Sequence, residues 1–240
     1  MHTYYLLDHD YSIDEKGGTM GHLLAFNPGS EDASLAVTVF YPDREPTRFT
    51  LRAPAGQSSE SNYANWPIEP RGPFALMVES DKPLVCQSTV GWNNQFNDYS
   101  PKPGGQYVNG VRECAKSYMA ISALAKDWYL ADGIVIDMPD KIWVRESEWA
   151  VLLNPGDEEA VVTASLYYST GLEERSVKVA PRRLLRLYMD EIARRNAHYG
   201  ARFVSDRPIA AQWLRAVYWS DRPDLLMTYW TVPCVPGPLA

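Results

Sequence analysis

The stretch Asn27–Tyr41 reads NPGSEDASLAVTVFY, and Asn154–Tyr168, which lies 127 residues further along the chain, reads NPGDEEAVVTASLYY. Six of the fifteen aligned positions are identical. A second pair of blocks follows at an offset of 125 residues, Ser80–Gln87 (SDKPLVCQ) and Ser205–Gln212 (SDRPIAAQ). Because the blocks keep their order along the chain, the sequence contains a duplicated domain.

The repeated unit has the pattern of β-structure. Larger apolar residues alternate with smaller or polar ones from Leu35 to Tyr41 and again from Val162 to Tyr168, and a period of two residues is typical of strands. The Asn-Pro-Gly before each strand favours a turn, because Pro fixes φ and Gly accepts a positive φ. We therefore predict an all-β protein of two tandem β-sandwich domains related by internal duplication, at residues 1–122 and 123–240.

Two weaker matches extend the repeat. Tyr5–Asp8 (YLLD) aligns with Tyr129–Asp132 (YLAD), and Lys116–Ile121 (KSYMAI) aligns with Met227–Val232 (MTYWTV). One segment has a helical signal: Asp190–Asn196, in which Asp190 is predicted to be the N-cap.

Several segments resemble the sensory rhodopsin transducer family. Glu148–Ala160 (EWAVLLNPGDEEA) is similar to that family's HExxCILNAGDEDA segment, and Ser205–Arg215 (SDRPIAAQWLR) is similar to its SNVPIVVQHTR block. Tyr41–Pro46 resembles its YxDKEP turn, and Ala180–Arg183 its PARR stretch. The resemblance implies small cytoplasmic β-sandwich domains that oligomerise, usually as single-domain tetramers.

The chain departs from the family pattern at two positions of the repeated Gln block. Trp213 stands where the family has His, and Val90 replaces its Arg in the first repeat. A site of the family is therefore altered here, and the resemblance alone does not imply a rhodopsin partner, because one fold hosts many roles.

Composition limits the class of protein. The 240 residues carry 23 basic and 30 acidic side chains, a formal net charge of −7, which disfavours nonspecific binding to nucleic acid or to an anionic membrane. No apolar run reaches the roughly 18 residues of a membrane helix, and the first residues do not resemble a signal peptide. From the absence of such a run we expect no membrane insertion. Cys86, Cys114 and Cys234 are far apart, which favours buried thiols in a reducing compartment, so we expect a cytoplasmic location.

Catalytic and metal-binding motifs are scarce. The sequence has no HExxH, GxSxG, GxGxxG or P-loop, and we expect no cofactor. The run Asp8-His9-Asp10 together with His22 offers mixed nitrogen and oxygen ligands. Alternation along a strand would place Asp8 and Asp10 opposite His9, so we favour a solvated strand end, and a metal or weak catalytic site there stays open. We expect Glu146 and Glu148 to lie on an exposed charged face.

A polar, amide-rich segment follows Trp92 and reads WNNQFNDYS. Amides beside a flat aromatic ring suit a sugar, because the ring stacks on C–H groups while Asn and Gln bond hydroxyls as donors and acceptors. Trp219 begins a shorter loop of similar kind. The alternative is a surface loop anchored by an ordinary tryptophan.

Gln87 and Gln212 occupy the same place in the two repeats. A buried glutamine usually satisfies backbone groups, whereas on a binding face it would bond a ligand, with Arg215 beside it in the second repeat. A basic cluster of Arg182, Arg183 and Arg186 suits carboxylates or phosphate, including those of a neighbouring subunit. The candidate ligand-binding residues are Gln87, Trp92, Asn93, Asn94, Gln212, Trp213, Arg215 and Trp219.

These observations predict a non-catalytic cytoplasmic ligand-binding or sensory accessory protein. Its target is a carbohydrate or other small polyhydroxy ligand, or a protein partner. One alternative is an enzyme or enzyme subunit acting on carbohydrates, with acidic residues near Asp8-His9-Asp10 or at Glu148. The other is a purely structural assembly module. If the contact between domains survived duplication, the two halves pack pseudosymmetrically and two chains form a homodimer, a four-domain assembly.

Overall fold

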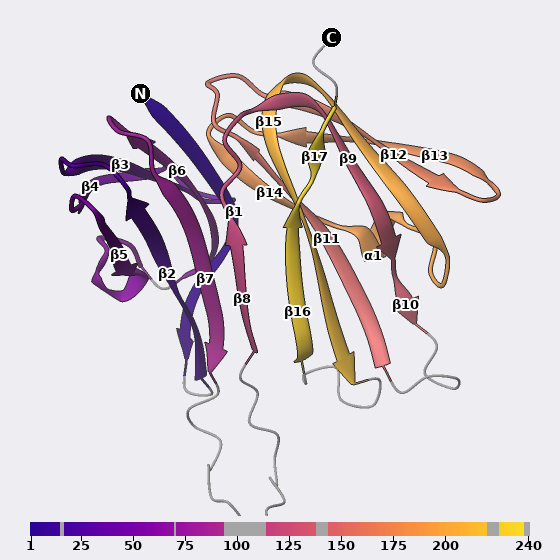
Figure 1. Cartoon of the computed structure of the whole chain (residues 1–240). Coiled ribbons are helices and arrows are strands. Elements are labelled where there is room, and N and C mark those ends of the chain that lie inside the picture. Colours follow the sequence, from indigo (N-terminus) through magenta and orange to yellow (C-terminus); the bar gives the residue numbers. More distant parts are fainter. Residues whose placement is uncertain (15–16, 70, 94–113, 138–143, 220–225, 238–240) are drawn as a thin grey trace, which may run out of the picture.

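The computed structural model describes residues 1–14, 17–69, 71–93, 114–137, 144–219 and 226–237, and these residues fold almost entirely into antiparallel β-structure (Figure 1). The first half contributes β1 (His2–Asp14), β2 (Gly17–Asn27), β3 (Ala33–Phe40), β4 (Thr47–Ala53), β5 (Gln57–Asn62), the 3-10 turn η1 (Tyr63–Asn65), β6 (Arg71–Ser80), β7 (Val85–Asn93) and β8 (Cys114–Met119). The second half contributes β9 (Ala125–Ile134), β10 (Ile136–Asp137), β11 (Val144–Asn154), β12 (Ala160–Tyr168), β13 (Gly171–Val179), β14 (Arg183–Tyr188), the helix α1 (Met189–Ile192), β15 (His198–Trp219), β16 (Leu226–Pro233) and β17 (Val235–Pro236). The predicted all-β fold is confirmed.

Each half builds its own sheet, which folds over into two layers. The first half forms an eight-stranded sheet in the order β4-β3-β6-β1-β2-β7-β8, with β5 paired to β2. The second half forms a nine-stranded sheet in which the long strand β15 pairs with β12 near its start and with β11 near its end. The chain passes from one layer to the other at the repeated Ser-Asp-Lys/Arg-Pro motif, residues 80–83 and 205–208.

The duplication is visible in individual hydrogen bonds. The side chain of Asn27 donates to the backbone carbonyls of Glu31 at 2.8 Å and Ala53 at 3.0 Å, and its Oδ1 accepts the N–H of Gly29 at 3.0 Å. Asn154 makes the equivalent bonds to Glu158, Val179 and Gly156 at 2.8, 3.0 and 3.0 Å. The Asn-Pro-Gly motif therefore closes its own turn in each half and ties that turn to the end of a distant strand, β4 in the first half and β13 in the second.

Both halves also carry the same β-bulge. In the first half, Leu7 and Asp8 lie opposite a single residue of β6. In the second half, Ala131 and Asp132 lie opposite Gly200 alone. A bulge of this kind bends the strand and shifts its alternation by one residue.

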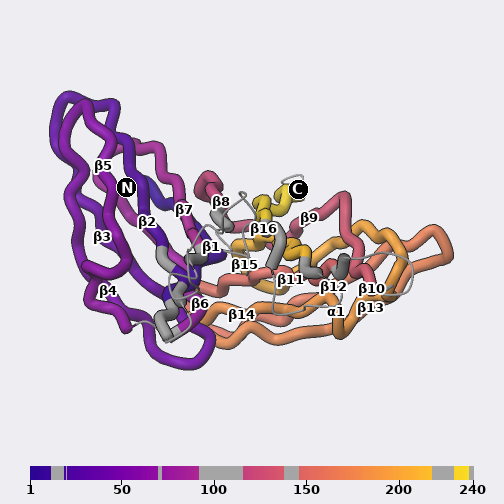
Figure 2. The backbone as a smooth tube through the Cα atoms, turned by 90° about the horizontal axis from the view of Figure 1, so that it is seen from below, coloured from indigo at the N-terminus to yellow at the C-terminus, as the bar shows by residue number. Residues whose placement is uncertain are grey.

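The two halves share a hydrophobic core. Tyr5, Leu7, Phe40, Ala75 and Ile121 of the first half are buried in the same cluster as the interior of the second half. Figures 1 and 2 show β1 and β8 lying against the sheet of β11, β15 and β16. This contact covers the face of the second sheet that points away from its own second layer.

Two local expectations need correction. The predicted helix over Asp190–Asn196 is a single turn, α1, because the Asp190 carboxylate instead accepts hydrogen bonds from Ser147 and from the N–H of Glu148. The alignment of Lys116 with Met227 is wrong by three residues. Lys116 pairs with Val90, and Trp230 pairs with the equivalent residue Arg215, so Lys116 corresponds to Trp230.

Within the described part of the chain, no helix is long and apolar enough to cross a membrane.

Candidate functional site

A charged cluster lies where β11 and β15 pair in the second half. Glu148 and Arg215 face each other across the two strands, and Arg215 Nε donates to Glu148 Oε1 at 2.7 Å. The same guanidinium lies 3.5 Å from a carboxylate oxygen of Glu146 and 3.6 Å from one of Asp132. Glu148 is fully buried, whereas the side chain of Asp132 is 71% exposed, so the cluster runs from the interior of the sandwich to its surface.

Glu148 is held by further donors. The Tyr199 hydroxyl donates to Glu148 Oε2, and the N–H of Ile134 donates to Oε1 at 2.8 Å. Burial is the largest effect on this carboxyl and raises its pKa to about 7, although the hydrogen bonds and the charge of Arg215 act in the opposite direction. Gly133 leaves room for the Tyr199 ring, because an ideal Cβ at that position would overlap it.

Two tryptophan rings flank the guanidinium. Arg215 lies 4.7 Å from the centre of the Trp213 ring and 5.6 Å from that of Trp230, within cation–π range. The indole N–H of Trp213 is buried and has no hydrogen-bond partner among the described residues. We refer to Asp132, Glu146, Glu148, Tyr199, Trp213, Arg215 and Trp230 together as the Glu148 site.

The Glu148 site combines the groups that bind hydroxyl-rich molecules. Three carboxylates accept hydrogen bonds, a guanidinium and an indole N–H donate them, and aromatic faces suit C–H groups. His198 lies at the rim, 4.0 Å from Asp132 and mostly exposed. The geometry can therefore hold a polar ligand, and the raised pKa of Glu148 lets that group exchange a proton near neutral pH.

A second polar cluster joins the two halves. The Asp8 carboxylate accepts bonds from Lys116 and, at 3.1 Å, from Arg186 of the second half. Burial, followed by the charge of Arg186, holds the pKa of Lys116 well below its usual range. Arg183 also reaches the first half, where it pairs with Glu45. Arg182 pairs with Asp157 within the second half. Arg183 and Arg186 therefore bind carboxylates of the first half, and this cluster holds the halves together.

His9 lies in a third buried network, inside the first half. Its Nδ1 bonds the Tyr63 hydroxyl and, at 3.2 Å, Ser88, while its Nε2 bonds the Tyr118 hydroxyl at 3.1 Å. Its ring stacks on Phe74, and burial lowers its pKa to about 3, so the imidazole is neutral.

The bulge in β1 places Asp8 and His9 both in the interior, so the expectation of a solvated strand end is wrong. In the part of the chain that the structure describes, no group of His, Cys, Asp and Glu side chains has an arrangement that could hold a metal ion.

The candidate residues named from the sequence do not meet in one place. Gln87 lies on an outward face of the first sheet, and Gln212 is buried between the halves, where it accepts the N–H of Leu7. Trp213 and Arg215 belong to the Glu148 site. Asn94 lies outside the described residues, as do the side chains of Trp92, Asn93 and Trp219.

Sequence reasoning named Glu148 only as an acidic residue of the alternative enzyme, and it missed the roles of Tyr199 and Asp132. Glu148 was expected on an exposed face, and it is buried. One feature of the sequence could have revealed the pair. Glu148 and Arg215 are oppositely charged residues within two apolar, family-like segments, and buried charged residues are commonly paired.

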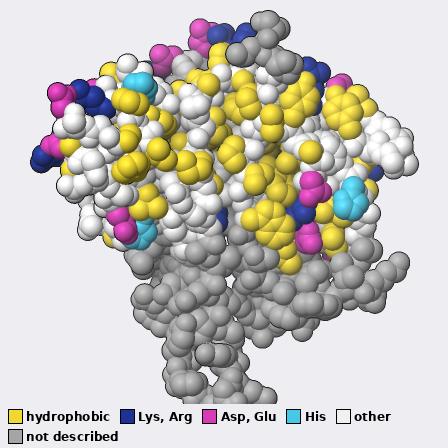
Figure 3. All heavy atoms as spheres, in the orientation of Figure 1, with side chains coloured by type: hydrophobic (Ala, Val, Ile, Leu, Met, Phe, Trp, Pro, Cys, Tyr) yellow, Lys and Arg dark blue, Asp and Glu magenta, His cyan; other side chains and the backbone are white. Residues whose placement is uncertain are grey.

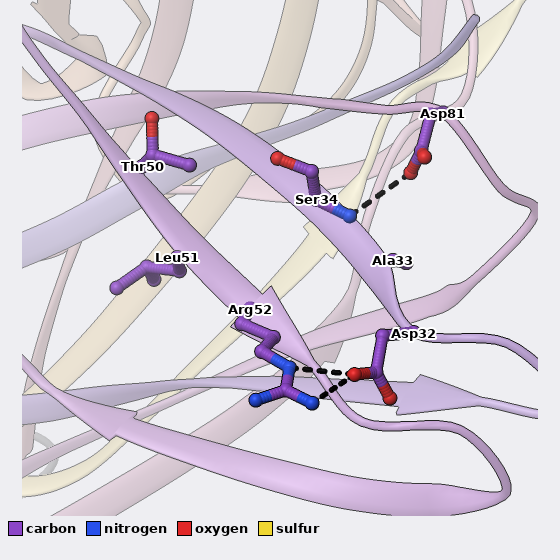
Figure 4. Close-up of a pocket in the computed structure, with 7 residues that line it drawn as sticks. All are labelled: Asp32, Ala33, Ser34, Thr50, Leu51, Arg52 and Asp81. Atoms are coloured by element: carbon purple, nitrogen blue, oxygen red, sulfur yellow. Dashed lines mark hydrogen bonds and ion pairs between the residues drawn. The ribbon is translucent and has the colours of Figure 1, made fainter.

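A groove of about 590 Å³ lies on the first half. Figure 4 shows the residues that line it, Asp32, Ala33, Ser34, Thr50, Leu51, Arg52 and Asp81. Its Arg52–Asp32 ion pair has an equivalent in the second half, Lys178–Glu159. The shared pairing supports a structural role for this groove in anchoring the turn before β3.

One family model matches part of the chain. Residues 124–230 match the family model described as "Anabaena sensory rhodopsin transducer". No curated protein matches the chain.

Among solved structures, the protein is similar to Thermotoga maritima 1070, with 19% identity over 48% of this chain and 97% of that one and a TM-score of 0.42. It is also similar to the Anabaena sensory rhodopsin transducer, with 22% identity over 35% of this chain and 90% of that one and a TM-score of 0.32. A Bacteroides uniformis β-glucuronidase matches at 9% identity, over 95% of this chain and 25% of that one, with a TM-score of 0.19. Residues 124–230 are therefore similar to the sensory rhodopsin transducer family, and the motifs around Glu148 and Gln212 lie within the matched residues.

Proposed function

We propose that the protein is a non-catalytic sensory or accessory binding protein whose ligand, a small polyhydroxy compound such as a sugar, binds at the Glu148 site. The family of residues 124–230 supports a role in partner interaction. One observation carries the ligand proposal: Arg215 lies between two tryptophan rings and among three carboxylates, one of which reaches the surface.

The chemistry of the site favours hydroxyl groups over a simple anion. Three carboxylates surround one guanidinium, so the local charge is negative and an anion would be repelled. Carboxylates accept hydrogen bonds from hydroxyls, and the exposed part of Trp230 offers a flat ring for a sugar face. The unpartnered indole N–H of Trp213 supplies one further donor.

The experiment is a thermal-shift and calorimetric screen of the full chain against neutral sugars, sugar acids and polyols. A ligand that binds the native state raises Tm. Trp230→Ala and Asp132→Asn are expected to abolish the shift, whereas Glu159→Gln, an exposed carboxylate elsewhere in the second half, is the matched control and retains it. A shift that survives both site variants, or no shift with any compound, contradicts the proposal.

A second candidate is hydrolysis of carbohydrates, which the pKa of Glu148 near 7 favours, because a general acid works best when its pKa lies near the ambient pH. Turnover of any ligand from the screen that Glu148→Gln abolishes would establish this activity in place of binding alone.

We further propose a cytoplasmic location, two domains at residues 1–122 and 123–240, and a homodimer of four domains. Cys86 and Cys234 are buried free thiols, as expected in a reducing compartment. The separate sheets support the domain boundaries.

A further inference from the structure

One face of the sheet is exposed in the first half, whereas the equivalent face of the second half is buried. The outward face of β2, β7 and β8 carries Phe26, Val85, Gln87 and Met119, and we call it the Gln87 face. Val85 and Met119 are 45% and 50% exposed there. At the positions equivalent to Phe26, Val85 and Gln87 stand, in that order, Leu153, Ala210 and Gln212 of the second half. These three residues are fully buried against the first half.

The glutamine on this face is held in the same way in both halves. Gln212 Nε2 donates to the Thr231 hydroxyl at 2.7 Å, and its Oε1 is thereby free to accept the N–H of Leu7. Gln87 Nε2 donates to the Ser117 hydroxyl, the equivalent of Thr231. Each hydroxyl in turn donates to a backbone carbonyl, at 3.1 Å for Ser117 and 2.9 Å for Thr231. The carbonyl of Gln87 is therefore oriented for an N–H, but on an exposed face.

The complementary surface is exposed on the second half of the same chain. In the first half, Tyr5, Leu7, Phe40 and Ile121 cover the face around Gln212. Register relates them to Tyr129, Ala131, Tyr167 and Val235, which we call the Tyr129 face.

Tyr167 and Val235 are 46% and 65% exposed, and the repeated bulge places the N–H of Ala131 where Leu7 has its own. Figure 3 shows hydrophobic side chains gathered on this view of both halves. Each chain therefore presents both surfaces of a contact that it already makes once internally.

We propose that the Gln87 face of one chain is covered by the Tyr129 face of a second copy, in the same geometry that joins the two halves of a single chain. This names the surfaces of the proposed homodimer and rests on that part of the proposed function. The contact is head-to-tail, and Figure 2 shows the two halves turned relative to each other rather than stacked in line. Two chains joined by two such contacts then close into a ring with C2 symmetry.

Charge makes the contact between chains weaker than the contact within a chain. Inside the chain, Arg186 pairs with Asp8. The equivalent residues between chains are Glu60 and Asp132, so two carboxylates approach each other. His22 beside Glu60 and Arg215 beside Asp132 offset part of the repulsion. The dimer is therefore reversible, and a positive charge at residue 60 strengthens it.

Light scattering and sedimentation equilibrium of the full chain, without sugar, test the contact. The wild-type protein is expected near 54 kDa, twice the 27.1 kDa of one chain. Glu60→Arg supplies the missing partner for Asp132 and is expected to lower the dissociation constant about tenfold. Val85→Asp and Tyr167→Asp each give a 27.1 kDa monomer, while Thr50→Asp, on the outer surface of β4, leaves the dimer intact.

A mixture of the two disrupted chains identifies the head-to-tail geometry. The Val85→Asp chain keeps its Tyr129 face and the Tyr167→Asp chain keeps its Gln87 face, so the mixture regains association through one good contact. Monomeric wild-type and Glu60→Arg proteins at micromolar concentration overturn the proposal, and so does a mixture that stays monomeric. Residues 60, 85 and 167 lie outside the Glu148 site, but Asp132 belongs to both the site and the contact. The sugar screen is therefore repeated on the Val85→Asp chain, in which a ligand shift without dimerisation, or dimerisation of the wild type without a ligand shift, distinguishes the two proposals.

Discussion

The two halves use the same scaffold but fill one interior position differently. In the second half, the facing pair Glu148 and Arg215 lies beside Tyr199. At the same register in the first half, Gly21 faces Val90, and Phe74 takes the place of Tyr199. The first half therefore has no counterpart of either charge of the Glu148–Arg215 pair.

Other side chains occupy the space thus left in the first half. His9 stands where the second half has Gly133 and stacks on Phe74. Tyr63 lies over Gly21 so closely that an ideal Cβ there would overlap the Tyr63 ring. In the second half the charged groups of this position reach the surface, whereas in the first half His9 and aromatic rings fill the position and the charged Asp8 beside them is buried against Arg186. Duplication thus allowed one interior to become a purely structural one.

The largest expected effect comes from emptying the aromatic interior of the first half. Tyr63 is fully buried against Trp66, Phe74 and His9, so Tyr63→Ala is expected to lower the free energy of unfolding by about 3–5 kcal/mol. The control is Tyr188→Ala at a half-exposed tyrosine, with a loss below about 1 kcal/mol. Urea denaturation measures both, and equal losses would show that Tyr63 does not fill the position that Glu148 fills in the other half.

The next effect is a pH dependence specific to the second half. Because the pKa of Glu148 rises from 4.5 to about 7 on folding, the native state binds this proton more tightly than the unfolded chain does. Stability contributed by the protonated carboxyl is complete below about pH 4.5 and is lost as the pH rises towards 7, by on the order of 3 kcal/mol. Glu148→Gln removes this loss. Unfolding free energies at pH 5 and pH 8 check it, and identical slopes in both proteins would refute the assignment.

The smallest effect concerns the part that the halves share. Asn27 and Asn154 make matching sets of hydrogen bonds to buried backbone groups, so Asn27→Ala and Asn154→Ala are each expected to lower the free energy of unfolding by about 2 kcal/mol. Chemical denaturation should give values that agree within about 1 kcal/mol. A loss confined to one half would mean that the repeated turns differ in their structural role.

The sequence predicted the structure correctly where that structure depends on residues close together in the chain. The Asn-Pro-Gly turns and the alternation after them predicted the strands and the duplication, because turn chemistry and strand period are local. The position of Glu148 was not predictable in this way. Strand β11 is covered on both faces, by the first half and by the second layer of its own sandwich, so both Glu148 and Trp149 are buried. Alternation separates the two faces of a strand, but it does not reveal that both are covered.

The location of Asp8 and His9 shows a second limit. Simple alternation would have separated them, but the bulge opposite Ala75 brings both into the interior. A bulge depends on a partner strand about 65 residues away in the chain, and a window of local sequence contains no record of that partner.

The same bulge decides which mutations each half tolerates. A substitution at Leu7 or Ala131 changes one side chain, but a one-residue deletion there would remove the bulge and reverse the facing of the rest of the strand. In β1, such a deletion would turn either His9 or the residues before it away from their partners. The fold therefore tolerates a change of residue type at these two positions better than a change of length, whereas an insertion in a turn reverses no strand.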